Sequence, residues 1–270
     1  MPELPDLEAV RRILNAEIGG AKIDRVHVMP PLSIRHPATA GALPNLAGDT
    51  LWRIDRQGKY LLFMFESDRV LAIHSMLVGR FQYCDRKERL KPGTCFAFDL
   101  KGEMQLRYFD SKMMGKLYLL EEGKLARIPR WNEMGPDALD EALTLDVFRS
   151  RVKRHAGQTK SVLTNDKFVA GIGNAYADEI LWEAGVYPFW ARTSLSDEEI
   201  ESLYHAMKSV LSEAVETLTG RMKADISEEI RDFLKVHRKG GQPCPRCGSP
   251  ISQVEANRKI TNYCRTCQKG

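Results

Sequence analysis

The sequence lacks a long apolar run. No stretch approaches the roughly 20 apolar residues that a membrane-spanning helix needs. The N-terminus has neither the basic n-region nor the apolar h-region of a secretory signal. Internal repeats and low-complexity segments are also missing. These absences argue against a membrane-spanning or secreted class, so we expect a cytoplasmic protein without a membrane partner.

Cysteine is scarce outside the C-terminal end of the chain. Four of the six cysteines lie between residues 244 and 267, as two CxxC pairs. This clustering indicates metal ligation in a reducing compartment and argues against a disulfide framework. Cys84 and Cys95 stand apart, and we expect both to be buried apolar side chains.

The composition is that of a folded protein with a sizeable core. The chain has 270 residues, of which 43% are hydrophobic and 28% charged. That length suits two ordinary domains and a small third module. The net charge of +4 is compatible with a polyanionic partner but does not by itself establish one.

Hydrophobic periodicity divides the chain into a β-rich part and a helical part. Apolar residues at helical spacing predict an amphipathic helix over residues 5–18. Six short β-prone runs then predict an all-β layer or sandwich packed against that helix. A capping box formed by Ser196 and Glu199 predicts a long helix that reaches about Leu218. The β-prone runs are Lys22–Met29, Tyr60–Phe65, Val70–His74, Cys95–Leu100, Met104–Tyr108 and Lys116–Leu120.

These patterns predict an α+β protein. We place the β-rich domain at residues 1–130 and a proline- and glycine-containing hinge at 131–141. The helical domain then spans residues 142–239, and a metal-binding module spans 240–270.

The spacing of the C-terminal cysteines is typical of a structural zinc site. Each CxxC pair supplies two thiolates on one tight turn, and two pairs can close one tetrahedral Zn²⁺ site. Four thiolates leave no open coordination position, which indicates a structural metal. The ligands are Cys244, Cys247, Cys264 and Cys267.

The first residues allow two interpretations. Once Met1 is removed, Pro2 carries a secondary amine, and the carboxylate of Glu3 follows directly. An amine beside a carboxylate can form an imine at a carbonyl-like carbon and move the protons that this needs. The stretch is equally typical of an ordinary helix start, because proline and acidic residues are favoured there.

A second informative stretch is the glycine-rich turn at residues 168–179. Gly171 and Gly173 permit a tight turn, and Asn174 heads a helical pattern that it could cap while leaving N–H groups for a phosphate. Lys160 adds a candidate phosphate contact. A simple helix–turn–helix hairpin remains the alternative for this stretch taken alone.

Taken together, these motifs resemble one family. Pro2-Glu3-Leu4-Pro5, Gln57-Gly58-Lys59-Tyr60-Leu61, Gly171-Ile172-Gly173-Asn174 and the terminal CxxC…CxxC occur in this order in formamidopyrimidine-DNA glycosylases and endonuclease VIII. The resemblance covers essentially the whole chain. It implies an N-terminal β-sandwich flanked by helices, a helix–two-turn–helix domain and a C-terminal zinc finger.

The resemblance also implies roles for individual residues. Pro2 corresponds to the nucleophile at the sugar C1′, and Glu3 to the acid/base that protonates the sugar ring oxygen. Lys59 corresponds to a strand lysine near the reacting sugar. Asn174 corresponds to a phosphate-binding asparagine that Lys160 supports. Asp6 and Glu179 are expected to hold the N-terminus and a nearby loop in place.

The sequence departs from the family pattern at several DNA-facing positions. Where the family usually places an arginine in the finger hairpin, this chain has Lys259 with Arg258 beside it, and either could contact the phosphate. The void-filling positions are His74 and Leu77 in one loop and Met113 and Met114 in another. Apolar wedges can unstack a base step, but an arginine fork that reads the opposite base is missing there, so the preferred lesion stays open.

The resemblance therefore implies a bifunctional DNA glycosylase and abasic-site lyase of base excision repair. It would remove oxidised bases through an imine at the N-terminal proline and cut the strand by β,δ-elimination. Its expected partner is double-stranded DNA with a damaged base or an abasic site, and we expect a monomer with one structural zinc. The alternative is a catalytically silent DNA lesion or abasic-site binding protein on the same fold.

Overall fold

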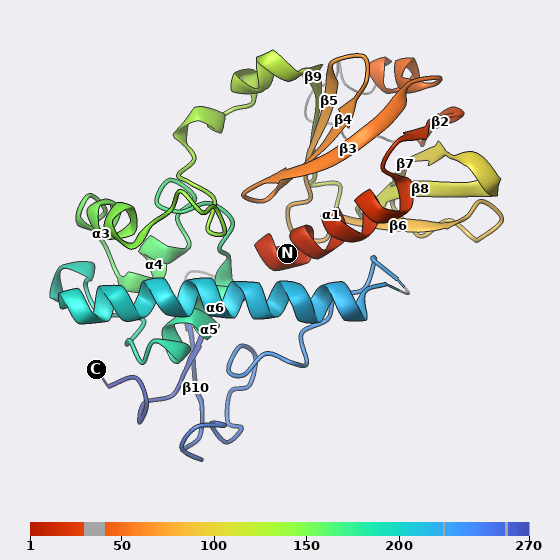
Figure 1. Ribbon diagram of the computed structural model, residues 1–270. Coiled ribbons are helices and arrows are strands. Elements are labelled where there is room, and N and C mark those ends of the chain that lie inside the picture. The colour runs from red at the N-terminus through yellow and green to blue at the C-terminus, as the bar shows by residue number, and fades with distance from the viewer. Residues whose placement is uncertain (30–40, 224, 257–258, 270) are drawn as a thin grey trace. The chain divides into compact units, whose positions relative to one another are not determined.

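A computed structural model describes residues 1–29, 41–223, 225–256 and 259–269 (Figure 1). The chain divides into two compact units. The first contains Met1–Asn132 and Val215–Glu229, and the second contains Glu133–Ala214 and Ile230–Gly270. None of the helices in the described ranges is long and apolar enough to cross a membrane.

The first unit is built on two antiparallel sheets. The five-stranded sheet has the order β1-β3-β4-β5-β9, and the four-stranded sheet has the order β2-β7-β8-β6. The first comprises β1 (Ala21–Lys22), β3 (Thr50–Gln57), β4 (Tyr60–Phe65), β5 (Arg69–His74) and β9 (Lys116–Glu121). The second comprises β2 (Arg25–Val28), β7 (Thr94–Asp99), β8 (Met104–Phe109) and β6 (Arg80–Asp85).

Aromatic side chains fill the space between the two sheets. The ring of Phe63 on β4 lies 5.4 Å from that of Phe81 on β6, and Phe81 lies 5.2 Å from Tyr108 on β8. All three rings are buried. The predicted sandwich is therefore confirmed, and six of its strands lie where the β-prone runs predicted them. The strands β3 and β6 were not predicted, because charged and polar residues interrupt both.

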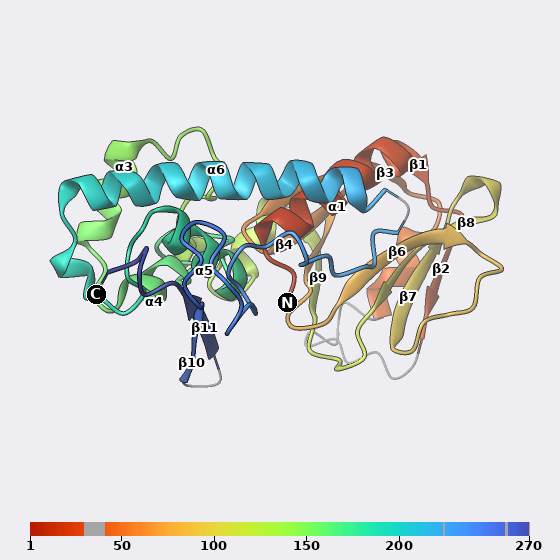
Figure 2. The same cartoon turned by 90° about the horizontal axis from the view of Figure 1, so that it is seen from below.

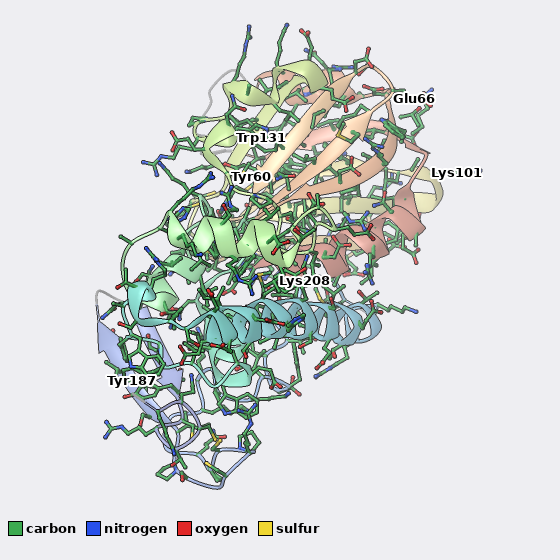
Figure 3. All side chains as sticks on the ribbon, turned by 60° about the vertical axis from the view of Figure 1, so that its left-hand side comes forward. Tyr60, Glu66, Lys101, Trp131, Tyr187 and Lys208 are labelled. Carbon is green, nitrogen blue, oxygen red and sulfur yellow. The ribbon has the colours of Figure 1, made fainter. Side chains whose placement is uncertain are left out.

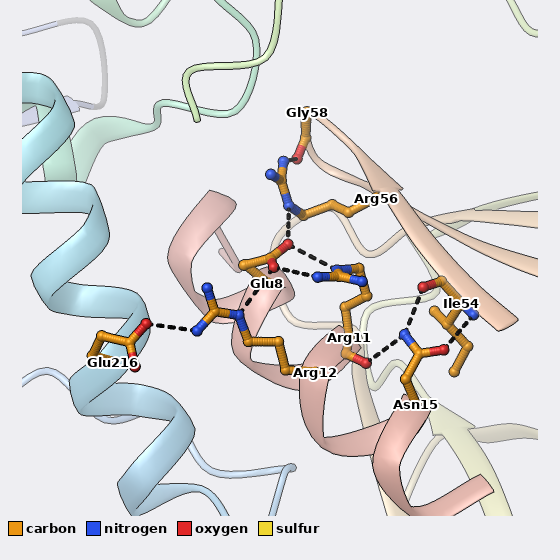
Figure 4. A network of polar contacts seen from close by, with 8 residues as sticks. All are labelled: Glu8, Arg11, Arg12, Asn15, Ile54, Arg56, Gly58 and Glu216. Carbon is orange, nitrogen blue, oxygen red and sulfur yellow. Dashed lines mark hydrogen bonds and ion pairs between the residues drawn. The ribbon is translucent and has the colours of Figure 1, made fainter. Parts of the chain in front are cut away.

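Helix α1 (Leu4–Ile18) confirms the predicted first helix and packs on β3. Its buried face is apolar, but one acid, Glu8, is also only 7% exposed. Glu8 accepts hydrogen bonds from Arg11, from Arg12 and, across to β3, from Arg56 (Figure 4). Burial opposes ionisation of this carboxyl, but the guanidinium groups of Arg11 and Arg56 outweigh it and lower the pKa of Glu8.

The second unit is helical and ends in a β-hairpin. Its helices are α3 (Leu145–Lys153), α4 (Thr159–Leu163), α5 (Asn174–Glu183) and the long α6 (Asp197–Arg221), whose residues from Val215 on belong to the first unit. The hairpin pairs β10 (Ser252–Ala256) with β11 (Lys259–Tyr263), beside α5 in both ribbon views (Figures 1 and 2). Short 3₁₀ turns occur at Leu43–Leu46, Lys101–Glu103, Glu122–Arg127, Trp131–Glu133 and Arg192–Ser194.

The predicted start of the long helix is confirmed. Ser196 N donates to the Glu199 carboxylate at 2.8 Å, and Glu199 N donates to Ser196 Oγ at 3.2 Å. This reciprocal pair is a capping box and satisfies two N–H groups at the start of the helix.

The Glu8 cluster yields a stability prediction. We expect Glu8→Gln to lower the free energy of unfolding at pH 7 by about 2 kcal/mol, because charged hydrogen bonds to the buried Arg56 are lost. A carboxyl whose pKa is lowered by folding stabilises above its unfolded pKa, and this contribution disappears as pH falls through the folded value. Denaturant unfolding at pH 7 and at pH 3 measures both effects, and the two proteins should converge at the lower pH.

Glu216→Gln is the matched control. Glu216 accepts from Arg12 in the same cluster at 2.6 Å, but its side chain is 71% exposed. An exposed ion pair stabilises by roughly 0–1 kcal/mol. Equal losses in the two variants would contradict the assignment of Glu8 as the centre of the cluster.

Candidate active site and metal centre

The N-terminal residues include the start of helix α1 and line a small pocket. Glu3 is the N-cap of α1, and its backbone N–H donates to Asp6 Oδ2 at 2.8 Å while the Glu3 carboxylate accepts from Asp6 N. Glu3 is only 3% exposed. Pro2 lines a small pocket together with Ser75, Arg80 and other residues of the first unit. Asp6 thus holds the N-terminal residues in place, as predicted.

Lys59 occupies the tight turn between β3 and β4. Gly58, the first residue of this two-residue turn, has a φ of 55°, where glycine fits without strain. Arg56 donates to the Gly58 carbonyl at 3.0 Å and to Glu8 on α1 at 3.0 Å (Figure 4). The turn that carries Lys59 is therefore tied directly to the helix that begins at Glu3. Lys59 itself is 7% exposed.

His74 and Leu77 lie where β5 ends and the loop to β6 begins. His74 Nδ1 accepts from Met76 N at 3.1 Å, and its ring packs edge-on against Tyr60, 4.9 Å away. Tyr60 in turn packs on Trp131 of the same unit (Figure 3). Leu77, at the tip of the loop, is 41% exposed. A large apolar side chain at a loop tip is available for a partner surface.

Met113 and Met114 lie in the loop between β8 and β9, and Asp110 organises that loop. The Asp110 carboxylate is buried and accepts N–H groups from Lys112, Met114 and Gly115 at 3.0, 2.8 and 2.6 Å. Met113 has a φ of 50°, which methionine rarely adopts. The hydrogen bonds to Asp110 offset that cost. Both methionines are partly exposed and are not core residues.

The two loops share one support. A Cβ at Gly79 or at Gly115 would collide with the hydroxyl of Tyr108, which is fully buried. Tyr108 thus lies beneath both the loop of Leu77 and the loop of the methionines. Its burial raises the pKa of the phenol well above the ordinary value. Sequence reasoning missed Asp110 and Tyr108, because their importance depends on which loops they contact.

The second unit corrects the expected cap of α5 and shows the partners of Lys160 within the protein. Asn174 does not cap α5: Gly173 is the N-cap, and Asn174 is the first residue of the helix. Lys160, expected to support a phosphate contact, is buried, and its charge has partners within the protein. Its Nζ lies 2.6 Å from Asp178 and donates at 2.9 Å both to the Ile260 carbonyl and to Thr261 Oγ1. The buried acid on the neighbouring helix explains this position, and it could not be inferred from the lysine alone.

Asn174 and Lys160 nevertheless come together. Asn174 Nδ2 donates to the same Ile260 carbonyl at 2.8 Å, so both side chains hold the β11 strand of the hairpin. Lys259 is the exposed first residue of that strand. Arg258, its alternative as a phosphate contact, lies outside the described residues. The hairpin predicted for this stretch is confirmed.

Two acids of α5 fix the segment that precedes the cysteines. Glu179 is buried and accepts the backbone N–H groups of Lys235, Val236 and His237 at 2.8–2.9 Å. This confirms the expectation that Glu179 anchors a loop, although burial raises the pKa of its carboxyl. Asp178 accepts Asn262 N at 3.1 Å and lies 2.8 Å from His237 Nδ1.

The four predicted cysteines form one cluster. Their sulfur atoms all lie within 4.8 Å of one another, with separations of 3.9 Å for Cys244–Cys267 and 3.4 Å for Cys247–Cys264. A tetrahedron of sulfurs about 2.3 Å from a central ion has edges of about 3.8 Å. The cluster therefore fits one tetrahedral Zn²⁺. Cys84 and Cys95 are buried elsewhere, as predicted.

Comparison with known proteins places the chain in one family. Three family models match in succession: the formamidopyrimidine-DNA glycosylase N-terminal domain at residues 1–117, its H2TH domain at 134–225, and the zinc finger found in FPG and IleRS at 241–270. The formamidopyrimidine-DNA glycosylases of Pelotomaculum thermopropionicum and Listeria innocua are 33% and 34% identical to it. Both alignments cover all of this chain, and 99% and 100% of those proteins.

Solved structures agree with this assignment. The Lactococcus lactis formamidopyrimidine-DNA glycosylase, bound to DNA that contains an abasic site, has a TM-score of 0.87 and 27% identity. That match covers 99% of this chain and 100% of the other. A variant of the same enzyme in complex with a Fapy-dG containing DNA has a TM-score of 0.88 and 26% identity. The chain belongs to the formamidopyrimidine-DNA glycosylase family, and its four cysteines form a structural zinc finger.

The loop of the two methionines allows a direct test. We expect Asp110→Asn to lower the free energy of unfolding by roughly 1–3 kcal/mol, because a neutral amide cannot accept all three N–H groups as the carboxylate does. The amides of Met114 and Gly115 should lose hydrogen-exchange protection selectively. Asp140→Asn is the control, since the exposed Asp140 side chain accepts the Ala142 N–H at 2.9 Å in a similar turn far from the methionine loop. Unchanged protection at Met114 and Gly115 would refute the role of Asp110.

Proposed function

We propose that this chain acts on damaged DNA through the amine of Pro2, which attacks the sugar C1′. The protein is a DNA glycosylase and abasic-site lyase. The observation that carries the proposal is the start of α1, where Pro2 lines a small pocket and is followed directly by Glu3, the N-cap residue. Glu3 can therefore exchange protons next to the reacting nitrogen.

The reaction has one covalent requirement. In the chain that begins with Met1, the Pro2 nitrogen is an amide and has no basic lone pair, so Met1 must be removed first. The freed α-amino group has an ordinary pKa of about 7.7–8.0, so a useful fraction is neutral at pH 7. Its lone pair forms the bond to C1′ while the bond from C1′ to the damaged base breaks and the base takes that electron pair. The proline nitrogen then loses its N–H proton, which balances the charge of the departing base.

Ring opening and strand cleavage follow. Glu3 donates a proton to the sugar ring oxygen, the C1′–O bond breaks, and C1′ and the proline nitrogen form an iminium ion. The iminium withdraws electrons from C2′, which loses a proton as the 3′-phosphate leaves in β-elimination. A further proton loss expels the 5′-phosphate in δ-elimination. Water then releases the sugar fragment from Pro2.

Lys59 is assigned to the same centre. Its turn is tied to α1 through Arg56 and Glu8, so Lys59 and Glu3 are carried by one braced pair of elements. We assign it to a phosphate near the reacting sugar, where an ammonium offsets the charge of the leaving phosphates.

The remaining assignments concern the grip on DNA. The exposed Leu77, with Met113 and Met114, would fill the space left by the extruded nucleotide, as apolar wedges do. His74 supports the Leu77 loop through its bond to Met76. On the second unit, Asn174 begins α5, where the helix dipole favours a phosphate, and Lys259 adds a positive charge. Lys160 is assigned to hold Ile260, and Arg258 stays a candidate from sequence.

The substrate class follows from the related structures. Those proteins are complexed with DNA that contains an abasic site or Fapy-dG, and we propose duplex DNA with oxidised purines or abasic sites for this chain. Met113 stands where the family has the base-reading arginine, and Met114 stands where it has the wedge aromatic, so we expect weak dependence on the opposite base. We further propose a monomer that acts at the nucleoid in the cytoplasm, where its DNA substrate lies.

The nucleophile is tested by trapping. We expect the Met1-processed protein to form a covalent adduct with abasic-site duplex under borohydride, which reduces the iminium to an amine. A variant with one uncleavable residue inserted before Pro2 should give no adduct, because its proline nitrogen is acylated. DNA binding by that variant is the control for its fold. An adduct of normal yield from the extended protein would refute Pro2 as the nucleophile.

Glu3 is tested by separating the two half-reactions. We expect Glu3→Gln to slow base excision roughly 100-fold or more, since proton transfer by a placed side chain contributes about that much. Strand cleavage at a preformed abasic site should fall less, because the free sugar already samples its open aldehyde. Single-turnover rates on both duplexes measure the difference, and equal losses would contradict the assigned role.

The borohydride trapping experiment also tests the alternative function, a lesion-binding protein without catalysis. A catalytically silent lesion-binding protein would bind abasic duplex without any trapped adduct after verified Met1 removal. The arrangement of Pro2, Glu3 and Lys59 favours the enzyme.

A further inference from the structure

The end of helix α5 is built into the cysteine cluster. Arg246 lies between the first two cysteines, and its guanidinium donates to the carbonyls of Trp182 and Glu183 at 3.1 and 3.2 Å. Both carbonyls lie in the last turn of α5, where helical carbonyls run out of regular partners, and Trp182 O also accepts the Gly185 N–H at 3.2 Å. The first CxxC turn therefore caps α5 from outside.

The second CxxC turn grips the chain just beyond the helix. Gln268 is 1% exposed and donates to the Val186 carbonyl at 2.9 Å, while its side-chain oxygen accepts from Cys264 N at 2.9 Å. Both CxxC turns thus contact one short segment, residues 182–186, at the end of α5.

Trp182, on helix α5, directly contacts Cys244, one of the expected metal ligands. Its ring is 4% exposed and packs with Val236, Ile251 and the cysteines in one small core. The indole N–H donates to Cys244 Sγ at 3.3 Å. The guanidinium of Arg246 lies over the ring at 4.3 Å, and Lys235 lies on it at 5.3 Å.

The charge of the four metal ligands explains why a hydrogen bond from Trp182 would matter. Four thiolates around Zn²⁺ leave two net negative charges on the cluster. Donors in the next layer disperse that charge and hold each ligand in its orientation. Cys244 is 2% exposed, so water cannot readily replace the indole as a donor. A buried indole N–H likewise needs an acceptor, and here it is the thiolate.

We propose that Trp182 is a hydrogen-bond donor to the zinc-bound thiolate of Cys244 and controls how tightly the finger retains its metal. The zinc site then extends beyond residues 244–267 and includes the end of α5. This inference concerns metal retention and does not depend on the role of Pro2.

Trp182→Phe tests the proposal, because phenylalanine keeps an aromatic ring but has no N–H. We expect zinc to transfer to a chelating dye roughly 10-fold faster than from the parent protein, the lower end of the usual effect of such partners. Trp52→Phe is the matched control, since Trp52 lies in the first unit and is 44% exposed. Identical release rates in all three proteins would overturn the proposal.

A second measurement uses the unaltered sequence and covers the case in which Trp182→Phe folds poorly. The finger is reconstituted with an NMR-active cadmium isotope in place of zinc. A hydrogen bond to a metal-bound sulfur transmits scalar coupling, so we expect a correlation between cadmium and the indole proton of Trp182. A well-folded cadmium protein without that correlation would also overturn the proposal.

Discussion

The bond between Glu8 and Arg56 fixes the geometry of the proposed catalytic centre. Glu8 belongs to the helix whose N-cap is Glu3, and Arg56 braces the turn that carries Lys59. Together with the reciprocal hydrogen bonds between Asn15 and the backbone of Ile54, this contact holds α1 against β3 and its turn. Misplacement of a catalytic group by about 1 Å can cost roughly 100-fold in rate. We therefore expect this buried ion pair to influence the precision of the proposed chemistry through the elements that it joins.

Other buried carboxylates also hold segments of the protein in place. Asp110 shapes the methionine loop, and Asp178 and Glu179 hold the finger hairpin and the irregular segment before the cysteines. Each accepts backbone N–H groups that no helix or sheet satisfies. A carboxylate suits this task because its two oxygens can take several donors at once.

Sequence reasoning succeeded where a local pattern determines the outcome. The amphipathic helix at α1, the capping box of Ser196, the cysteine spacing and most strands are properties of short stretches. It could not foresee contacts between segments that lie far apart in the sequence. Lys160 has the charge of a phosphate ligand, but Asp178 on the neighbouring helix draws it inward. Strands β3 and β6 carry charged residues such as Arg56 and Arg80, which pair with acids from other segments, and these residues hide the alternation that periodicity detects. The roles of Pro2, Glu3 and Lys59 rest on family resemblance, because chemistry at an N-terminus leaves no pattern of spacing.

The grip of Arg246 and Gln268 on the end of α5 limits how this protein can be rearranged. Zinc ribbons are often regarded as portable cassettes that can be exchanged between chains. Here the ribbon supplies the cap of a helix, and the helix supplies part of the ribbon's core. A foreign ribbon with perfect cysteine spacing would lack the donors that Arg246 and Gln268 give to the carbonyls of Trp182, Glu183 and Val186. Recombination at this junction should succeed only when α5 and the ribbon are inherited as one piece.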